Sequence, residues 1–530
     1  MSVAAPADTP DLRAALESSE FYPDQPDHVQ VVETHVSWVF LAGDRAYKLK
    51  KPVVLPFLDY GTAQRRREMC REEVRLNRRL AGDIYLGTRA VVATEHGFRL
   101  TDDDDPLAVD YLVEMRRYDE RSTLAAKLER GVLMDAEIAE VARALVEFHA
   151  RARRCAPAGR PARTVLRRVA ENCHQLLDVI EQGADIDRVL ELERFAHAFV
   201  MAHARTLEAR ARGGLFREGH GDLRADHVLV DGSVRIVDCV EFDGRLRELD
   251  VADDLAFLVM DLAVRGGERC AQTLVRAYRA AGGEPGEDWL IAFYAADRAL
   301  VRAKVALVRA SQCPAASPER GRRHALARDL VGVAERCAWR ARLPLAIVIC
   351  GAPASGKSHL AHALAEVSGL PHLSSDVTRK RLAGLRPRQP APAAAYSADF
   401  NRLTYAELGR RAAAEVARCG GVLIDATCRH RVDRAAFAAS FGHAAPVLFI
   451  ECRAPADVLA RRAAERDRQP GQVSDASAPI VVREAAAWED LDELDPETHL
   501  TVRSDRPVEA QLTDLRALLD RRIGRPGSWR

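Results

Sequence analysis

A glycine-rich segment in the second half of the chain constrains the fold more than any other feature. Gly351 to Ser358 reads GAPASGKS; it follows the apolar run Leu345 to Cys350 and precedes a stretch with helical spacing. A strand, a glycine-rich turn and a helix that opens with Lys-Ser form a cradle for nucleotide phosphates, because backbone N–H groups of the turn face the phosphate oxygens. The segment therefore predicts an ATP or GTP site.

Each residue of this segment has a predicted part in the site. The amine of Lys357 would reach the β- and γ-phosphates, and the hydroxyl of Ser358 would bind Mg²⁺. The turn itself would enclose the phosphates with its backbone. The predicted nucleotide-binding residues are Gly351, Ala352, Pro353, Ala354, Ser355, Gly356, Lys357 and Ser358.

Strand-like and helix-like stretches alternate after this segment, which predicts a parallel sheet wrapped by helices. Short strands close at Asp376 and at Asp425, so both carboxylates should reach the sheet edge that carries Ser358. Asp425 is placed to bind Mg²⁺ directly or through water. Asp376 is placed to orient or deprotonate an acceptor hydroxyl, and a helix N-cap is the alternative interpretation for it.

Arginines that follow these strands predict contacts to substrate and from a lid. Arg379 lies one helical turn after Asp376, where it could hold an anionic substrate. The predicted helix Pro455 to Glu465 carries Arg462, and Arg466 follows just before a flexible-looking loop. Such arginines stabilise the transferred phosphoryl group when a lid closes. Because nearly all of the 78 basic residues are Arg, a surface position is the alternative for each one.

A second group of chemically active residues lies upstream, between Gly219 and Leu262. A polar loop there carries Asp222 and His227, and two short apolar strands follow around Asp231-Gly232, a favoured hairpin turn. Asp238 stands at the end of the second strand. Phosphoryl transfer needs one group to orient the acceptor hydroxyl and others to hold Mg²⁺, and this arrangement of acids is suited to it.

The HGDL sequence followed by a hairpin that ends in an acid resembles the aminoglycoside phosphotransferases and the related choline and protein kinases. The resemblance implies that Asp222 is the catalytic base and Asp238 the main Mg²⁺ ligand. His227 stands where most of the family has a metal-binding Asn. Imidazole is a poor ligand for a hard cation, so Asp226 or a water would replace the missing ligand, or this domain handles metal weakly.

Other parts of the first half extend this resemblance. A hairpin predicted over Val36 to Leu41 and Arg45 to Lys50 places Lys48 where the family has its phosphate-contacting Lys, although Lys50 points the same way. The helix that follows offers Glu73 or Glu72 as the ion-pair partner of that Lys, and a solvated i,i+4 pair is the alternative for either Glu. The segment Glu114 to Arg116 resembles the hinge that binds adenine. Three further acids, Asp250, Asp253 and Asp254, are expected to cap and brace the catalytic loop, with substrate binding as the alternative.

The second half resembles small P-loop kinases of the shikimate, gluconate and chloramphenicol kinase type, and also the polynucleotide 5′-kinase and zeta-toxin group. The whole chain resembles a bacterial two-domain family described as a predicted kinase. The expected fold is α/β and α+β: an N-terminal segment 1–30, a bilobal protein-kinase-like domain 31–338, and a P-loop NTPase domain 343–525 of the AAA family ATPase class, with a parallel sheet wrapped by helices.

Composition limits the remaining possibilities. The formal net charge is zero, so a general electrostatic grip on nucleic acid is not indicated, although a local basic patch remains open. No apolar run approaches 18 residues, and the N-terminus has no basic start followed by an apolar stretch. We expect a cytoplasmic protein without membrane contact. The eleven Cys form no metal-binding pattern and are expected to be reduced, mostly buried thiols.

These patterns predict a bifunctional small-molecule kinase, which transfers the γ-phosphoryl group of Mg-ATP to a hydroxyl acceptor at each of two sites. One alternative makes the first domain a non-catalytic ligand-binding module that regulates the P-loop kinase. A further alternative makes the P-loop domain a polynucleotide 5′-hydroxyl kinase. The acceptors, the oligomeric state and the coupling between the domains stay open at this point.

Overall fold

The computed structural model describes residues 9–34, 36–55, 58–95, 97–155, 160–181, 183–343, 346–467, 488–521 and 523. The chain divides into two compact units. The first comprises Met1–Pro161, Glu208–Gly286 and Val305–Ala325, and the second comprises Ala162–Leu207, Glu287–Lys304 and Leu326–Arg530. Among the described helices, none is both long and apolar enough to cross a membrane. The ten cysteines with described side chains are all free thiols.

The first unit begins with a six-stranded antiparallel sheet in the order β1-β2-β3-β8-β6-β7. Its strands are β1 (Val29–Glu33), β2 (Ser37–Ala42), β3 (Arg45–Lys50), β6 (Tyr85–Thr94), β7 (Gly97–Asp102) and β8 (Ala108–Arg116). Smaller elements of this part are α1 (Thr9–Glu17), η1 (Ser19–Phe21), β4 (Val54–Leu55) and β5 (Leu58–Asp59). The β2–β3 hairpin confirms the predicted one, with Gly43 at a positive φ in its turn.

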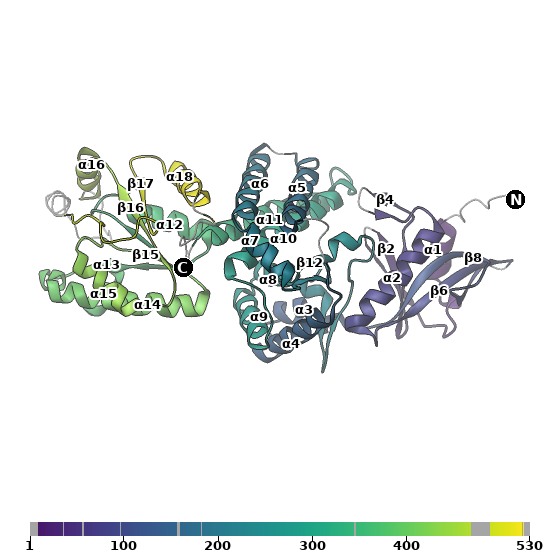
Figure 1. The fold of residues 1–530 in the computed structure, drawn as a ribbon. Helices are drawn as coiled ribbons and strands as arrows, with labels where there is room; N and C mark the ends of the chain where they lie inside the picture. Colours follow the sequence, from purple (N-terminus) through teal and green to yellow (C-terminus); the bar gives the residue numbers. More distant parts are fainter. Residues whose placement is uncertain are drawn as a thin grey trace. The chain divides into compact units, whose positions relative to one another are not determined.

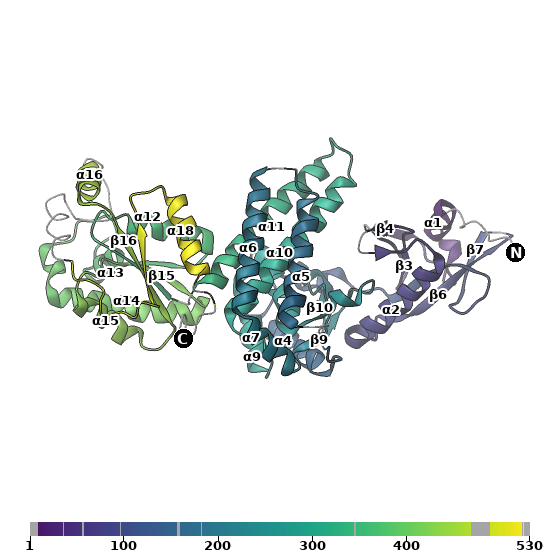
Figure 2. The same cartoon turned by 45° about the horizontal axis from the view of Figure 1, so that its top comes forward.

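Helix α2 (Ala63–Ala81) packs on this sheet (Figure 2). It begins at Thr62, whose side chain accepts a hydrogen bond from the Arg65 N–H at 3.3 Å and so caps the helix. Cys70 and Val74 recur at helical spacing and pack against Tyr111 and the other apolar residues of β6 and β8. The same buried face carries Glu73, which therefore points toward the sheet.

The remainder of the first unit is mainly helical. It contains η2 (Glu120–Ser122), α3 (Leu124–Glu129), α4 (Asp135–Arg151), α7 (Ala204–Arg212), β9 (Phe216–Glu218), η3 (Ala225–His227), β10 (Val228–Val230), β11 (Val234–Ile236), η4 (Gly244–Leu246), β12 (Glu248–Asp250), α8 (Val251–Val264) and α9 (Glu268–Ala280). Strands β10 and β11 form the predicted hairpin, but Val230 pairs with Val234, so three residues form its loop and not the predicted two. Gly232 has a positive φ in this loop.

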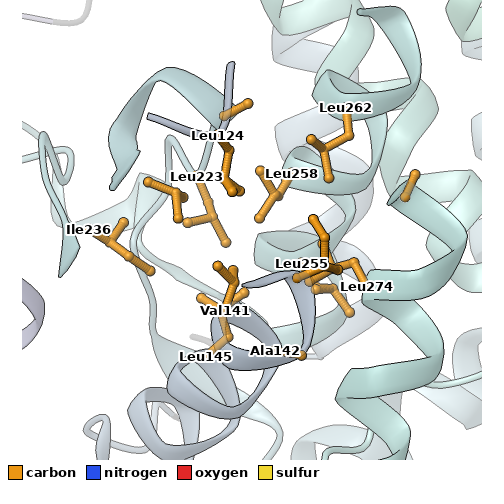
Figure 3. Close-up of a cluster of buried hydrophobic side chains, with 14 of the residues drawn as sticks. Leu124, Val141, Ala142, Leu145, Leu223, Ile236, Leu255, Leu258, Leu262 and Leu274 are labelled. Carbon is orange, nitrogen blue, oxygen red and sulfur yellow. The ribbon is translucent and has the colours of Figure 1, made fainter. Parts of the chain in front are cut away.

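An apolar cluster holds these elements beneath the loop that carries Asp222. Figure 3 shows Leu124 of α3, Val141 and Leu145 of α4, Leu223, Ile236, three leucines of α8 and Leu274 of α9 pointing toward one another. Each of these side chains is completely buried. Leu223 directly follows Asp222, so the packing of the Leu223 side chain helps to fix the position of Asp222.

The second unit combines helices with a parallel sheet. The helices that lie wholly or partly in this unit before the sheet are α5 (Pro161–Leu177), α6 (Gly183–Ala202), α10 (Asp288–Ser311) and α11 (Pro318–Arg342). Residues 305–311 of α10 and 318–325 of α11 belong to the first unit, and residues 204–207 of α7 belong to the second. The sheet and its helices are β13 (Ala346–Cys350), α12 (Lys357–Ser368), β14 (His372–Ser374), α13 (Ser375–Leu382), η5 (Ala393–Tyr396), α14 (Ala398–Cys419), β15 (Val422–Asp425), α15 (Arg431–Phe441), β16 (Val447–Arg453), α16 (Ala456–Asp467), β17 (His499–Arg503) and α18 (Val508–Asp520).

All five strands of this sheet are parallel, in the order β14-β15-β13-β16-β17, which confirms the predicted α/β arrangement. Helices α12 and α18 cover one face and α14 and α15 the other (Figure 1). Strand β13 lies in the centre and is completely buried. Its carboxyl end therefore opens into the Gly351 turn with neighbouring strands on both sides.

Replacing Leu258 by Ala should test the cluster under the Asp222 loop. Leu258 is completely buried in it, so we expect a loss of about 2–5 kcal/mol in the free energy of unfolding of the first unit. Urea denaturation followed by circular dichroism would measure the loss. The control is Leu107→Ala, because Leu107 is 70% exposed and its truncation should change stability by less than about 0.5 kcal/mol. Equal losses for both variants would contradict this description of the core.

Candidate functional site

A cavity of about 1040 Å³ opens in the first unit between the antiparallel sheet and the segments that follow β8 and β9. Apolar side chains from both sides line it, among them Val39, Ala46, Met115 and Val237. Lys48, His227 and Asp238 also line it. Polar and charged side chains outnumber the apolar ones in the lining, so this hollow could hold a small molecule that carries charge.

Lys48 joins two acids that come from distant parts of the chain. Its Nζ lies 2.8 Å from Oε1 of Glu73 on α2 and 2.6 Å from Oδ1 of Asp238 after β11. Burial alone would lower the pKa of Lys48, but the carboxylates of Asp238 and Glu73 raise it well above its ordinary value. Lys48 is therefore a permanent positive charge at the cavity wall.

Lys50 lies behind Lys48 and does not face the cavity. Its side chain is 0% exposed, and its Nζ donates to Oε2 of Glu73 at 2.6 Å and also to Glu241. Tyr60 donates to the same Glu241 carboxylate. Of the two predicted lysines, only Lys48 can meet a ligand in the cavity. Glu72 instead pairs with Arg75 and Arg247, so Glu73 is the acid beside both lysines.

Asp238 has an unusual backbone conformation. Its φ is +64°, in the left-handed region that residues other than glycine seldom adopt. The Asp238 N–H donates to the hydroxyl of Tyr85 at 3.1 Å, which helps to hold this conformation. Burial would raise the pKa of Asp238, but the Lys48 ammonium lowers it well below its ordinary value. Strain of this kind is common where a side chain must be aimed at a ligand.

The loop that carries Asp222 is held by a buried acid on α8. Asp254 accepts hydrogen bonds from the backbone N–H groups of His220 at 2.7 Å and Gly221 at 2.9 Å. His149 contacts the same carboxylate at 3.2 Å. Asp250 caps α8 through the Ala252 N–H at 2.9 Å. These contacts confirm the expected capping and bracing roles of Asp250 and Asp254.

His220 completes this support. Its Nε2 donates to the Val237 carbonyl at 3.0 Å, and its Nδ1 accepts the Asp222 N–H at 3.3 Å. Burial lowers the pKa of His220 to about 4, which agrees with a neutral ring. Asp222 is thereby tied to the residue that precedes Asp238. Burial would raise the pKa of Asp222, but the Arg224 guanidinium lowers it, so Asp222 remains a carboxylate.

His227 lies between Asp222 and Asp238, yet both of its ring nitrogens already have partners. Nδ1 is 2.9 Å from the Asp222 carbonyl, and Nε2 is 2.7 Å from Nη2 of Arg224. A carbonyl can only accept, so Nδ1 carries the proton and Nε2 accepts from Arg224. The predicted metal contact of His227 is therefore not present in this arrangement. Asp226, the predicted substitute, is bound by Arg265 at 2.6 Å.

The predicted hinge segment, Glu114 to Arg116, lies at the end of β8. Its backbone pairs with β3 and β6 and with the Ile84 carbonyl. Met115 of this segment and Tyr118, two residues after it, both line the cavity. Burial raises the pKa of Tyr118 to about 12, so its phenol stays neutral. The contact of this segment with adenine stays a prediction.

The P-loop segment has the backbone shape that a phosphate cradle needs. Gly351 (φ +147°), Ala354 (φ +64°) and Gly356 (φ +88°) all have positive φ, which curls the chain around the N-terminus of α12. A Cβ on Gly351 would lie 2.6 Å from the Cys452 carbonyl oxygen, so only glycine fits there. The first N–H groups of α12 have no partner within the helix and can bind phosphate oxygens.

Two acids stand at the carboxyl edge of the parallel sheet, as predicted. Asp425 ends β15, is 5% exposed, and has a buried Oδ1 without a hydrogen-bond partner among the described residues. Asp376 lies in the first turn of α13, whose N-cap is Ser374, so the alternative N-cap role for Asp376 is wrong. Burial raises the pKa of Asp376, whereas Lys357 lowers it and Asp425 raises it further.

The predicted substrate and lid arginines have structural contacts. Arg379 is buried, and its Nη1 donates to the Ala395 carbonyl at 2.7 Å and to Asn401 at 2.5 Å. Arg462 donates to the Ser504 carbonyl at 2.7 Å and to the Ser355 carbonyl at 3.4 Å, so it braces the P-loop from α16. The side chain of Arg466 and the loop after it lie outside the described residues.

The donor groups fit magnesium differently at the two sites. Among the described residues, no group of three or more His, Cys, Asp or Glu side chains is arranged to hold a metal. Mg²⁺ in nucleotide sites needs only one or two carboxylates, because phosphates and water complete its shell. The unpartnered Oδ1 of Asp425, which ends the strand beside β13, fits this need. In the first unit Asp238 and Asp222 offer oxygens, but His227 does not fit.

Several site residues escaped the sequence analysis. Arg224, Glu241, Tyr60 and Tyr85 all contact predicted site residues. A signal existed for Arg224, because it stands two residues after Asp222 in a short polar loop. Glu241 follows Asp238 by three residues. Nothing in the sequence indicates that Tyr60 and Tyr85 reach this site, because their contacts span more than 150 residues.

Replacing Lys50 by Met should show what the buried ion pairs contribute. Lys50 keeps the pKa of Glu241 below its ordinary value. A carboxylate with a lowered folded-state pKa stabilises the fold above its unfolded pKa, and this contribution is lost as the pH falls. We expect Lys50→Met to cost about 3–5 kcal/mol at pH 7, and the cost should shrink as the pH falls below about 4.3.

Urea denaturation at pH 7, 5 and 3.5 would measure this change. The control is Lys51→Met, because Lys51 pairs with the exposed Glu33 and such a pair contributes at most about 1 kcal/mol. A cost for Lys50→Met that is the same at all three pH values would mean that Glu241 does not depend on Lys50.

Replacing Gly351 by Ala should disable the P-loop. The added Cβ would collide with the Cys452 carbonyl, so we expect nucleotide affinity there to fall by about tenfold or more. Equilibrium dialysis of labelled ATP in a Lys48→Ala background would isolate this site. Gly321→Ala is the control, since a Cβ there meets nothing within 4 Å. Unchanged ATP binding by Gly351→Ala would exclude this segment as the phosphate cradle.

Comparison with known proteins identifies both halves of the chain. Residues 63–293 match the model of the phosphotransferase enzyme family, and residues 347–488 match an AAA domain model. Uncharacterized protein Rv2004c of Mycobacterium tuberculosis is 34% identical over 484 residues, which are 88% of this chain and 92% of that protein. A Mycobacterium bovis protein, Mb2027c, matches equally.

Solved structures resemble each half separately. A choline/ethanolamine kinase family protein from Mesorhizobium loti is 17% identical and covers 62% of this chain and 98% of its own, with a TM-score of 0.37. A gluconokinase from Sinorhizobium meliloti is 22% identical and covers 34% of this chain and 94% of its own, with a TM-score of 0.26.

The two matched domains are of the kinase or phosphotransferase type. The match to the mycobacterial proteins covers 88% of this chain, so it includes residues of both domains. The chain therefore belongs to the bacterial two-domain family, shared with these mycobacterial proteins, that joins a kinase-like phosphotransferase domain to a P-loop kinase domain.

Proposed function

We propose that this protein is a bifunctional ATP-dependent kinase, in which each domain transfers the γ-phosphoryl group of Mg-ATP to a hydroxyl of a small molecule. One observation carries the proposal for the first domain. Lys48, Glu73 and Asp238 come from β3, α2 and the segment after β11, and they meet within 2.8 Å at a cavity of about 1040 Å³. His227 lies between Asp238 and Asp222.

The residues of the first site have separable parts in this reaction. Lys48 would exchange its contact with Asp238 for phosphate oxygens, while Glu73 keeps its ammonium in place. Asp222 would orient the acceptor hydroxyl and take its proton as the phosphoryl group is transferred. Bound Mg²⁺ would offset phosphate charge, with Asp238 as its carboxylate ligand. The lowered pKa of Asp222 keeps it able to accept a proton at neutral pH.

The P-loop site would use a parallel set of groups on a different fold. The backbone of the turn and Lys357 would hold the phosphates, and Ser358 with Asp425 would hold Mg²⁺. Asp376 is the candidate base. Burial raises its pKa, Lys357 lowers it and Asp425 raises it, so Asp376 lies within the electrostatic reach of both groups. Arg462 contacts the turn from α16 and would hold its shape during transfer. Arg379 would act indirectly, through its contacts with Ala395 and Asn401.

One observation favours a second candidate function for the first domain. His227 and Arg224 bind each other where most relatives of this fold would place a metal-binding Asn, so the domain could bind nucleotide without transferring phosphate. It would then regulate the P-loop kinase by its occupancy. His227→Asn separates the two candidate functions. If the first domain only binds nucleotide, the substitution should create acceptor-dependent ADP release. If the first domain is an active kinase, the wild-type chain should already show this activity.

The central prediction concerns two variants that each silence one site. ADP release would be measured with Mg-ATP over a panel of sugars, aminoglycosides, nucleosides and 5′-hydroxyl oligonucleotides. We expect at least one acceptor whose turnover survives Lys357→Ala and falls about 10²–10⁴-fold with Asp222→Asn. We also expect a second acceptor whose turnover survives Asp222→Asn and is lost with Lys357→Ala.

The matched control for Asp222→Asn is Asp103→Asn. Asp103 lies in a turn, where it pairs with the exposed Arg71 and not with the cavity residues. Its replacement should leave every turnover unchanged. If each acceptor-dependent activity disappears with Lys357→Ala alone, the first domain is not an active kinase. If oligonucleotides are the best acceptors of the P-loop site, a small-molecule acceptor is excluded there.

A further inference from the structure

The guanidinium of Arg224 occupies the middle of the acid cluster in the first domain. Its Nε lies 3.1 Å from both carboxylate oxygens of Asp222, and its Nη2 lies 2.7 Å from Nε2 of His227. Its Nη1 lies 3.5 Å from Asp226. Arg224 thus contacts Asp222, the predicted base, His227, the predicted metal ligand, and Asp226, its predicted substitute. The position that a metal cation would take among these residues is already filled by the Arg224 guanidinium.

The hydrogen bonds of His227 explain why a metal ion does not fit beside it. Its Nδ1 proton is donated to the Asp222 carbonyl, so only the lone pair of Nε2 could bind a metal. That lone pair accepts a hydrogen bond from Arg224. A metal at this point would have to displace the guanidinium and would gain a nitrogen ligand, which Mg²⁺ disfavours.

Other cations near the cluster are committed elsewhere. Arg265 binds Asp226 at 2.6 Å and Asp261 at 3.2 Å, and it also pairs with Glu129. Lys48 is held by Glu73 and Asp238. Arg224 contacts Asp222, which would hold the acceptor, and it also contacts His227. Nε2 of His227 lies 3.6 Å from Asp238, which would hold the metal of the nucleotide.

We infer that Arg224 takes the place of a second metal ion: the first-domain site binds its nucleotide with one divalent ion, and the Arg224 guanidinium contacts the phosphoryl group that is transferred. This inference rests on the proposed function of the same site. When nucleotide binds, the guanidinium exchanges part of its contact with Asp222 for phosphate oxygens, which frees that carboxylate for the acceptor hydroxyl.

Arginine is suited to this position for two reasons. Its planar fork can hold a phosphate through two parallel hydrogen bonds, which a lysine ammonium cannot do. It also stays charged beside several carboxylates and needs no water shell. A fixed positive group at a transferring phosphoryl group stabilises the charge that develops on it. His227 then serves as a positioning residue, because its Nε2 aims the guanidinium toward the site.

The test counts metal ions in the full chain, in a Lys357→Ala, Ser358→Ala background that removes the P-loop contacts. Mn²⁺ binding is measured by electron paramagnetic resonance with a saturating non-hydrolysable ATP analogue, and analogue affinity is measured by calorimetry. With Arg224 and His227 intact, we expect one Mn²⁺ for each bound analogue. With Arg224→Gln and His227→Asn together, which remove the guanidinium and supply an oxygen ligand, we expect two.

Single variants provide the matched controls. Arg224→Gln should weaken analogue binding by about tenfold or more, because a charged hydrogen bond to phosphate is lost. Arg224→Lys keeps the charge without the fork, so it should still bind one Mn²⁺ with intermediate affinity. Arg269→Gln, at the exposed pair with Asp135, should change neither quantity. Circular dichroism would confirm that each variant is folded.

The outcomes separate this inference from the function on which it rests. Two Mn²⁺ ions with Arg224 intact, or one ion in the double variant, would overturn the inference and leave the nucleotide site standing. Unchanged analogue affinity in Arg224→Gln would also overturn it. If the background chain binds no analogue at all, the proposed nucleotide site of the first domain fails, and the inference fails with it.

Discussion

The first domain depends on one buried carboxylate. Glu73 is completely buried and gives one oxygen to Lys48 and the other to Lys50. Each lysine then reaches a further acid, Asp238 or Glu241, in the segment that follows β11. In a medium of low dielectric constant, each of these charges is tolerable only because its neighbours have the opposite sign. This row of charges fixes the sheet, helix α2 and the Asp238 segment in one arrangement.

A second set of contacts places Asp222 relative to this row. The carboxylate of Asp254 holds two backbone N–H groups of the loop from below, and His220 connects the loop to Val237. The apolar cluster around Leu223 fixes the same loop through packing. Because the support comes from buried groups on α4, α8 and β10–β11, the two reactive acids keep their separation without bonding to each other.

The two domains reach similar chemistry by different structural routes. The P-loop site is built mostly from consecutive residues, since backbone N–H groups and positive φ values create the cradle within Gly351 to Ser358. Among the residues that the structure describes, tertiary structure adds Asp376, Asp425 and the support from Arg462. The first site has no such local core. Its contacts join residues up to 191 positions apart, so it exists only once the domain has folded.

This difference decides what the sequence could reveal. The sequence by itself determined the P-loop, the parallel sheet and the β2–β3 hairpin, because those features depend on local spacing and on the period of apolar residues. It also placed Asp222, Asp238 and Glu73 among the candidates. Only the tertiary structure decided that Lys48 faces the cavity and that Arg379 is buried and donates to the Ala395 carbonyl. The same holds for the hydrogen bond from Arg224 to Nε2 of His227. Which partner a charged side chain finds depends on chain segments that spacing does not bring together.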